Sequence, residues 1–423
     1  MTATTTPRLN RAALAAGPPP PARIVHLGVG AFHRSHQAWY TARAADADQW
    51  GITGFTGRSA AAAERLGPQD GVYTLVTRDP DGDRFELIGS VVGVQPGERH
   101  DRLAAALAAP ATSVVTLTIT ETAYDVTHAD LTAPRTALAR LLHGLSARRD
   151  AGGGPLTVVP CDNLPDNGTR LAATLRLLAE QAAPDLVSWL DEHVSYVSTS
   201  VDRITPRAPA DLAEYVAAET GWYDEAPVIA EPFSDWVLAG DFPAGRPAWE
   251  TAGARFATDV RPYEARKLWM LNGAHSALAC AGLLRGHRTV DEAIGDPACR
   301  VLVGRFWAEC ERHLPPHLDL ARYREDLLAR FGNARMEHRL TQIAEDTTTK
   351  LRVRVVPVAL RELAAGRRAD GCAAVVAEWV RAVRAATVPA DGVGRDPLAA
   401  LSPELASSRT FRETMDSRTG SIS

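Results

Sequence analysis

The stretch RIVHLGVGAFH, residues 23–33, decides the fold of this chain. A β-rich run ends in Gly28 and Gly30, and a helical pattern follows, so the stretch predicts a strand, a tight turn and a helix. This order matches the first part of the dinucleotide-binding sequence motif, in which glycines let the backbone approach a pyrophosphate at the helix N-terminus. His33 stands where the third glycine would be. An ordinary tight turn between a strand and a helix is the alternative.

Strand-like and helix-like segments continue to alternate after this turn. A hairpin is expected from residues 72–78 and 85–94, around the turn DPDGD. The alternation predicts an α/β domain with a Rossmann-type, doubly wound and mostly parallel sheet over residues 23–260. Further strands are expected at residues 51–57, 113–120, 156–160 and 194–201, and helices at residues 35–45, 59–66, 135–149 and 168–181.

After about Pro262 the pattern changes to helices alone, which predicts a mainly α-helical C-terminal domain over residues 261–423. Residues 1–22 are expected to be a flexible lead-in. The helices are expected at residues 263–284, 290–309, 320–330, 339–344, 357–364 and 373–386.

The composition limits the classes of protein. The chain has 423 residues, 45% apolar and 23% charged, and its formal net charge of −5 gives no electrostatic case for binding nucleic acid or an anionic membrane. No apolar run approaches the roughly 18–20 residues that cross a bilayer. The five cysteines are scattered without a C-x-x-C pair, so neither a disulfide framework nor a structural zinc site is expected. The first residues lack the apolar stretch of a signal peptide, and we expect a cytoplasmic protein.

The residues after the second strand bear on the choice between NAD and NADP. A carboxylate at this place favours NAD, because it binds the ribose hydroxyls, whereas a basic residue favours NADP. The sequence here is Thr56-Gly57-Arg58-Ser59, without an acid. Arg58 and Ser59 could hold a 2′-phosphate, which favours NADP or the use of both dinucleotides. In the alternative, Arg58 only stacks on the adenine or faces solvent.

The second informative segment contains one of only two lysines in the chain. On a regular α-helix Glu264, Lys267, Asn272 and His275 lie within an arc of about 140°, and Lys267 and His275 are about 12 Å apart along the axis. A lysine can take the proton of an alcohol while hydride leaves the carbon, if burial and positive charge lower its pKa. Asn272 could then stabilise the alkoxide, His275 bind a hydroxyl, and Glu264 relay protons. The alternatives are an exposed ion pair of Lys267 with Glu264 and a helix break at Asn272-Gly273.

Two polar segments follow apolar strands. Asn163 lies in CDNLPDNG, residues 161–168, and Asp202 lies in STSVDRITP, residues 198–206. Because ligands of open α/β sheets bind at the carboxyl ends of strands, both residues are candidates for a substrate site. Helix capping by Asp166 or Asn167 and turn formation by Asp202 are the alternatives.

Together these segments make the chain resemble the mannitol dehydrogenase family, the polyol-specific long-chain dehydrogenases/reductases. The motif K-x4-N-x2-H and the CDNLP segment are specific in combination. The resemblance covers most of the chain and runs through residues 24–38 (IVHLGVGAFHRSHQA), 116–124 (TLTITETAY), 161–168, 201–206 (VDRITP), 231–237 (EPFSDWV), 267–276 (KLWMLNGAHS) and 338–350 (HRLTQIAEDTTTK).

The resemblance implies metal-independent hydride transfer with NAD or NADP in a monomer, and it assigns roles to individual residues. Lys267 would be the general acid/base and Glu264 its proton relay, while Asn163 and Asn272 would polarise the reacting oxygen. The substrate-binding residues would be Asp202, His275, His338, Arg339 and Lys350. The cofactor would meet Gly28, Gly30, Phe32, His33, Glu121 and Val201, in addition to Arg58 and Ser59.

Two departures from the family pattern concern specificity. The family's acidic residue after the second strand is missing, which puts a strict preference for NAD in doubt. Residues 346–352 read DTTTKLR where the family often has D-G-S-x-K-x-P, which puts the substrate in doubt. We expect an enzyme that interconverts a polyol and a ketose of the mannitol/fructose type.

Three other functions stay open. The first is the reduction of a hexuronate such as fructuronate to mannonate, with Arg339, Lys350 or Arg352 as the cationic partner of the carboxylate. The second is a zinc-dependent polyol dehydrogenase, against which the scattered cysteines argue. The third is a dinucleotide-binding sensor without catalysis, against which the set of Lys267, Asn272 and His275 argues. In each enzymatic case the partner is a small sugar alcohol, ketose or hexuronate.

Overall fold

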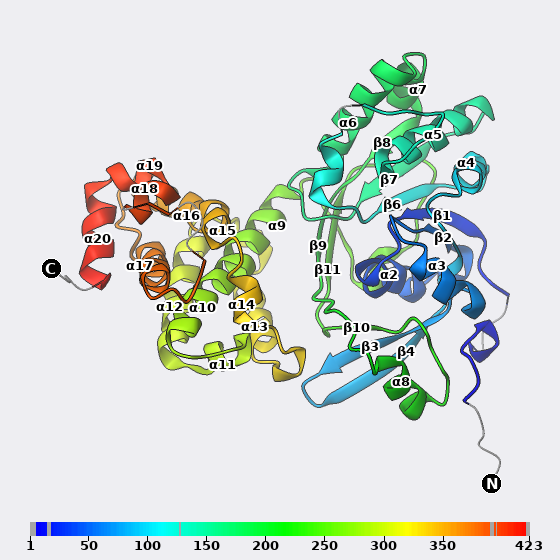
Figure 1. The fold of residues 1–423 in the computed structure, drawn as a ribbon. Helices are drawn as coiled ribbons and strands as arrows, with labels where there is room; N and C mark the ends of the chain where they lie inside the picture. The colour runs from blue at the N-terminus through cyan, green and yellow to red at the C-terminus, as the bar shows by residue number, and fades with distance from the viewer. Residues whose placement is uncertain (1–5, 15–17, 127, 390–392, 395, 420–423) are drawn as a thin grey trace, which may run out of the picture. The chain divides into compact units, whose positions relative to one another are not determined.

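The stretch that contains the glycine turn forms the central strand of a six-stranded parallel sheet (Figure 1). The computed structural model describes residues 6–14, 18–126, 128–389, 393–394 and 396–419, and the chain divides into two units, Met1–Val260 and Arg261–Ser423. The strand order β5-β2-β1-β6-β7-β8 confirms the expected Rossmann-type topology. The strands are β1 (Ala22–Leu27), β2 (Gly51–Phe55), β5 (Val91–Gln95), β6 (Val114–Leu117), β7 (Leu156–Pro160) and β8 (Val194–Tyr196).

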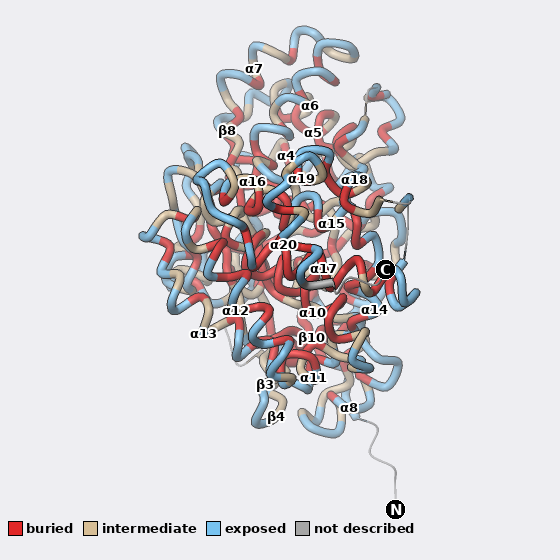
Figure 2. Tube along the Cα trace, turned by 90° about the vertical axis from the view of Figure 1, so that its left-hand side faces the viewer, coloured by how far each residue is buried: buried red, intermediate tan, exposed pale blue. Residues whose placement is uncertain are grey.

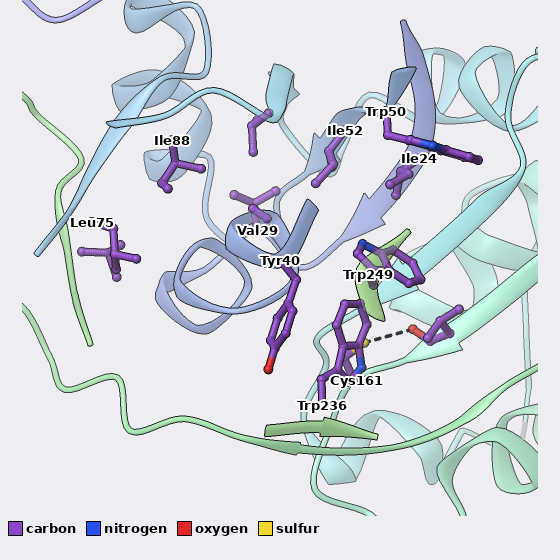
Figure 3. Close-up of a cluster of buried hydrophobic side chains, with 14 of the residues drawn as sticks. Ile24, Val29, Tyr40, Trp50, Ile52, Leu75, Ile88, Cys161, Trp236 and Trp249 are labelled. Atoms are coloured by element: carbon purple, nitrogen blue, oxygen red, sulfur yellow. Dashed lines mark hydrogen bonds between the residues drawn. The ribbon is translucent and has the colours of Figure 1, made fainter. Parts of the chain in front are cut away.

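Helices cover both faces of this sheet, because successive strand residues point to opposite sides. Ile24 faces a core that includes Tyr40, Trp236 and Trp249 (Figure 3), and Val25 faces a second core on the other side. Each such side chain contributes about 1.5–3 kcal/mol on burial. The helices on the Ile24 side are α1 (Ala31–Ser35), α2 (Gln37–Arg43) and α3 (Ala61–Leu66), and those on the Val25 side are α4 (His100–Ala108), α5 (Ala137–Asp150), α6 (Asn167–Ala182) and α7 (Leu186–His193).

Two smaller sheets complete the first unit. One contains the expected hairpin, β3 (Tyr73–Asp79) and β4 (Gly82–Ile88), with β10 (Val228–Ala230) beside β3. The other contains β9 (Ser198–Asp202), β11 (Asp235–Ala239) and β12 (Arg255–Phe256). A further helix, α8 (Leu212–Thr220), was not expected, nor were α4 and α7.

Three predicted elements are divided in the structure. The expected helix 35–45 is interrupted at His36, whose dihedrals (φ −119°, ψ −89°) separate α1 from α2. The expected strand 194–201 is two strands, because the chain leaves the main sheet at Val197 and β9 pairs with β11 instead. Likewise, the expected strand 85–94 ends at Ile88, and β5 then joins the edge of the main sheet.

Part of the predicted lead-in is fixed to the first unit. Leu9 is fully buried, and Arg8 forms a β-bridge with Tyr223. Arg11 donates hydrogen bonds to the carbonyls of Gly89 (3.0 Å) and Val91 (2.7 Å). Residues 6–14 of the predicted lead-in therefore make specific contacts with the first unit.

The second unit is helical, as expected, and is built around α10 (Gly273–Leu284) and α17 (Asp370–Arg384), both largely buried (Figure 2). The expected helix 290–309 is interrupted before Pro297, whose ring cannot continue a helix. The other helices are α9 (Arg261–Arg266), α11 (Val290–Gly295), α12 (Pro297–Glu311), α13 (Leu320–Phe331), α14 (Leu340–Ile343), α15 (Thr347–Arg354), α16 (Val356–Ala364), α18 (Pro397–Leu401), α19 (Pro403–Ser407) and α20 (Arg409–Thr419). Within the described residues, no helix is long and apolar enough to span a membrane.

Candidate active site

The turn after β1 requires glycine at its first position. Gly28 has φ +101°, and a Cβ there would lie 2.2 Å from the carbonyl oxygen of Thr118. Its own N–H donates to the carbonyl of Phe55 (2.8 Å), which holds the turn against β2. Gly30 is the N-cap of α1, and a Cβ there would make only an ordinary contact, 3.6 Å from the carbonyl oxygen of Gly28. Packing does not demand glycine at position 30, which fits the close approach of a ligand to the backbone.

His33 lies beneath this turn and not on its surface. Its ring is fully buried and stacks on His26, with centroids 3.4 Å apart and planes at 12°. Both nitrogens of His26 contact threonine hydroxyls, whereas those of His33 have no hydrogen-bond partner in the described part of the chain. Burial lowers the pKa of His26 to about 3 and that of His33 well below its usual value, so both rings are neutral. Contact of His33 with a cofactor stays a prediction.

A cavity of about 700 Å³ lies at the carboxyl ends of β1, β2 and β6. This is the edge at which open α/β sheets bind ligands, and the volume falls within the usual range for such sites. Gly28 and Arg58 line the cavity, together with Arg135 just before α5 and Arg140 in its first turn. The predicted cofactor residues Phe32, Ser59 and Glu121 lie outside this lining. Phe32 stacks on His36 (5.0 Å), and Ser59 and Glu121 are exposed.

Asn167 holds together the two polar segments, residues 161–168 after β7 and residues 198–206 around β9. Its amide group donates to the carbonyls of Pro160 and Thr199 and accepts from the N–H of Thr199 (2.8 Å), which joins the end of β7 to β9. Asn167 is therefore a structural clamp and not a helix cap. Asn163 is exposed in the loop that this clamp shapes, while Val201 and Asp202 are buried on β9.

Asp162, next to Asn163, is a carboxyl that the sequence did not single out. It accepts a hydrogen bond from the hydroxyl of Tyr124, which lies in the 3₁₀ turn Glu121–Tyr124. Burial raises the pKa of Asp162. This bond ties the loop of Asn163 to the loop after β6, so both loops at the edge of the sheet are held in one arrangement.

In the second unit Lys267–Asn272 form a π-helical turn between α9 and α10. The N–H of Gly273 donates to the carbonyl of Leu268, five residues earlier. The expectation of a regular α-helix is therefore wrong at these six residues. On an α-helix Lys267 and Asn272 lie about 140° apart, but residues five apart in a π-turn take the place of the i, i+4 pair and share a face. The structure thus brings these two side chains closer to one face than the sequence predicted.

Side chains from later helices hold this turn. The indole N–H of Trp307 donates to the carbonyl of Met270 (2.8 Å). A guanidinium nitrogen of Arg354 donates to the carbonyl of Asn272 (3.2 Å) and to the hydroxyl of Ser276 (3.0 Å). The carbonyl of Met270 also accepts from the N–H of Gly273, and that of Asn272 from the hydroxyl of Ser276 (3.3 Å), so Trp307 and Arg354 add bonds that fix the turn to α12 and α15.

His275 and His338, two of the predicted substrate-binding residues, contact each other beside this turn. Their ring centroids are 5.0 Å apart and nearly perpendicular. Nε2 of His275 is buried and has no hydrogen-bond partner among the described residues. Burial, and then the positive charges of Arg330 and Arg354 with His338, lower the pKa of His275 well below its usual value. His275 is therefore a neutral ring with an unused nitrogen.

Two cations extend this group, and one of them was not predicted. Lys350 lies one turn before Arg354 on α15 and donates to the carbonyl of Ile343 (3.1 Å). Burial, and then Arg354, lower its pKa. Arg354 was not predicted, whereas Arg352, which was, donates to the carbonyls of Ala400 and Leu401 in α18. The spacing around α15 could have indicated Arg354, but this helix was not predicted.

The remaining predicted residues of this unit are spread around the π-turn. Glu264 lies one turn before Lys267, and both side chains are half-buried. Arg339 is exposed at the start of α14, where its backbone forms a bridge with Thr289. In the described part of the chain, no group of three or more His, Cys, Asp or Glu side chains could hold a metal ion.

The strand order and the glycine turn define a Rossmann-type dinucleotide-binding unit, followed here by a helical unit with a lysine on a π-turn. Family models agree with this division. The mannitol dehydrogenase Rossmann domain matches residues 22–251, and the mannitol dehydrogenase C-terminal domain matches residues 259–411. The chain belongs to the mannitol dehydrogenase family and is an oxidoreductase, which confirms the resemblance seen in the sequence.

Individual relatives match this chain over most of its length and over most of their own. D-arabinitol 4-dehydrogenase of Ralstonia nicotianae is 40% identical over 358 residues, 78% of this chain and 76% of that protein. D-mannonate oxidoreductase of Escherichia coli is 35% identical over 386 residues, 85% of this chain and 79% of that protein. The solved structure of Pseudomonas fluorescens mannitol 2-dehydrogenase, a ternary complex with NAD and D-mannitol, gives a TM-score of 0.78 at 30% identity and covers 98% of this chain and 96% of that one.

Proposed function

We propose that this protein interconverts a sugar alcohol and its ketose, of the D-mannitol/D-fructose type, with NAD(H) or NADP(H) and without a metal ion. The observation that carries the proposal is the π-turn, which presents Lys267 and Asn272 on one face beside the neutral ring of His275. A lysine, an amide and a neutral imidazole form the donor set that a reacting alcohol or carbonyl needs.

The residues of the first unit fit a dinucleotide. The turn at Gly28 and Gly30 leaves the backbone open at the start of α1, and the cavity at the ends of β1 and β2 provides room beside it. When bound, the nicotinamide donates or accepts the hydride.

Lys267 handles the proton of the reaction. In the reducing direction its ammonium gives a proton to the carbonyl oxygen as the carbon gains hydride, and the product is an alcohol. In the oxidising direction the neutral amine takes that proton back. The amide N–H of Asn272 stabilises the negative charge that develops on the oxygen, and Glu264 returns Lys267 to its starting protonation state by exchange with water.

The other assignments rest on the family resemblance. Asn163, Asp202, Val201 and Glu121 keep their predicted roles toward substrate and cofactor as proposals. The protein is proposed to act as a cytoplasmic monomer.

Reduction of a hexuronate is the second candidate, and the cations on α15 favour it. Arg354 contacts Asn272 and acts on His275, Lys350 lies one turn before Arg354 on α15, and a carboxylate on the substrate would pair with these cations. The relative that is named D-mannonate oxidoreductase supports the same reading.

The test is a grid of NADH and NADPH against D-fructose and D-fructuronate, with D-mannitol and D-arabinitol in the oxidising direction, followed by nicotinamide absorbance. Turnover that resists a chelator and falls about 10²–10⁴-fold in Lys267→Met supports the proposal. Nucleotide binding by Lys267→Met should be unchanged. Full turnover by this variant would refute the role of Lys267, and preference for fructuronate would select the second candidate.

A further inference from the structure

We propose that the cavity at the end of β2 selects the dinucleotide with a phosphate on its adenosine ribose, so that the enzyme prefers NADP(H) to NAD(H). Arg140, together with Arg58, is the phosphate-binding residue. The inference rests on the proposed function, because it concerns the form of the cofactor that the first unit binds.

The loop that follows β2 and the guanidinium of Arg140 are held against one another. Arg140 belongs to α5, about eighty residues later in the chain, and donates to the carbonyl of Gly57 (3.3 Å). The N–H of Gly97 donates to the hydroxyl of Thr56 (3.0 Å) on the other side of the loop. A Cβ at Gly97 would lie 2.2 Å from the carbonyl oxygen of Thr56 and 2.6 Å from Nη1 of Arg140. The site is therefore tightly built, and Arg140 stands beside the residues that select the ribose.

The charge at this place has one sign. The lining of the cavity contains Arg58, Arg135 and Arg140 and no carboxylate. Among the described residues, none of these three arginines forms an ion pair within 4.0 Å. Glu98 is the acid that acts on Arg140, but its effect on the pKa of Arg140 is smaller than the opposing effect of burial.

A partly buried guanidinium without a paired anion is unfavourable, and the arrangement gains most from a ligand that brings the anion. An acid at the end of the second strand would hold the two ribose hydroxyls of NAD, whereas an arginine accommodates the 2′-phosphate of NADP. Nε of Arg140 donates to the carbonyl of Pro134 (3.4 Å) and Nη1 to that of Gly57 (3.3 Å), which orients the guanidinium. Nη2 and the second N–H of Nη1 are left to donate to a phosphate. The absence of an acid from the described lining and the presence of Arg140 thus favour the same form of the cofactor.

The experiment measures binding and does not depend on turnover. NADPH and NADH are titrated by their fluorescence, and 2′,5′-ADP and 5′-AMP by calorimetry, against the full-length protein. We expect NADPH and 2′,5′-ADP to bind at least about tenfold more tightly than their counterparts, the effect of one charge-assisted hydrogen bond. Arg140→Gln and Arg58→Gln should each remove about tenfold of the NADPH affinity and leave that for NADH within about twofold.

Arg149→Gln is the matched control, because Arg149 lies on the same helix and pairs with Asp150 away from the cavity. It should change neither affinity, and thermal unfolding should show that all three variants are folded. Equal or tighter binding of NADH would overturn the inference and leave the proposed function intact. A parallel loss of NADH and NADPH in Arg140→Gln would reduce Arg140 to a structural role and overturn its assignment. Binding of neither dinucleotide would overturn the proposed function itself.

Discussion

Replacement of Trp307 by phenylalanine tests whether the π-turn is held by side chains from outside it. The change removes the indole N–H that donates to the carbonyl of Met270 (2.8 Å) and leaves an aromatic ring in a site where Trp307 is 1% exposed. The carbonyl of Met270 also accepts from the backbone N–H of Gly273, so the change removes one of its hydrogen bonds and does not leave it unsatisfied, at a cost of about 0.5–1.5 kcal/mol. For a unit of this size that corresponds to a fall in Tm of about 2–4 °C for each kcal/mol.

The chain contains a matched control for the loss of ring volume. Trp379 on α17 is fully buried, and its indole nitrogen has no hydrogen-bond partner among the described residues. Trp379→Phe therefore removes the same atoms without removing a hydrogen bond. The two variants differ chiefly in the bond to Met270, and we expect Trp307→Phe to be the less stable by about 0.5–1.5 kcal/mol.

Activity gives the second readout. If the turn relaxes toward a regular α-helix, the directions of Lys267 and Asn272 diverge toward the α-helical separation of about 140°. Misplacement of a catalytic group by about 1 Å can lower kcat about 10²-fold, so Trp307→Phe should lose far more activity than Trp379→Phe. Chemical denaturation and steady-state kinetics measure both effects. Equal stability and equal kcat in the two variants would refute the view that Trp307 holds the turn.

Three further predictions concern other parts of the site. Gly28→Ala places a Cβ 2.2 Å from a backbone oxygen at φ +101°, so it should abolish dinucleotide binding and lower Tm. Gly67→Ala, whose Cβ would meet no atom within 4 Å, should do neither. Normal dinucleotide binding by Gly28→Ala in a fluorescence titration would contradict this prediction. The pKa of the buried His33 is depressed, so below about pH 6.5 the unfolded chain binds a proton at this residue and the native chain does not. The free energy of unfolding therefore falls with decreasing pH, by up to about 1.4 kcal/mol per pH unit for this residue. His33→Phe should remove this contribution, which urea titrations between pH 7 and 5 measure. Arg354→Met should lower kcat at least about tenfold, because it loses the bonds to the carbonyl of Asn272 and the hydroxyl of Ser276. Arg352→Met should keep kcat and lose about 1 kcal/mol of stability. A larger loss of kcat in Arg352→Met than in Arg354→Met would place the functional cation at Arg352.

The sheet could be predicted because its signals are local. The glycine turn at 28–30, the β-branched strands and the helices between them each lie within a few residues, and the main sheet has the expected topology. The division of strand 194–201 could not be predicted. Apolar and β-branched residues continue through Val197, and only the partners of the two halves, β7 and β11, show that the chain changes sheets there.

In the candidate site, too, the sequence predicts residues but not the contacts between distant segments that orient them. Lys267, Asn272 and His275 were found from their spacing, but the geometry that joins them depends on Trp307 and Arg354, which come from α12 and α15. The hydrogen bonds that stabilise a π-turn are formed after tertiary packing, and no pattern within the segment KLWMLN records them. Arg140 is a similar case, because its place beside Arg58 is a property of the fold and not of the sequence around either residue.

Gly273 connects these observations. In the sequence it suggested a helix break after Asn272, but the helix continues through it. A Cβ at Gly273 would lie 2.5 Å from the ring of Phe306 and 3.5 Å from the carbonyl oxygen of Arg354. The missing side chain lets α12 and α15 approach the turn closely enough for Trp307, the neighbour of Phe306, and Arg354 to reach its carbonyls. The glycine therefore acts through packing: it admits the two donors that fix the π-turn, and these donors set the orientation of the residues on either side of it.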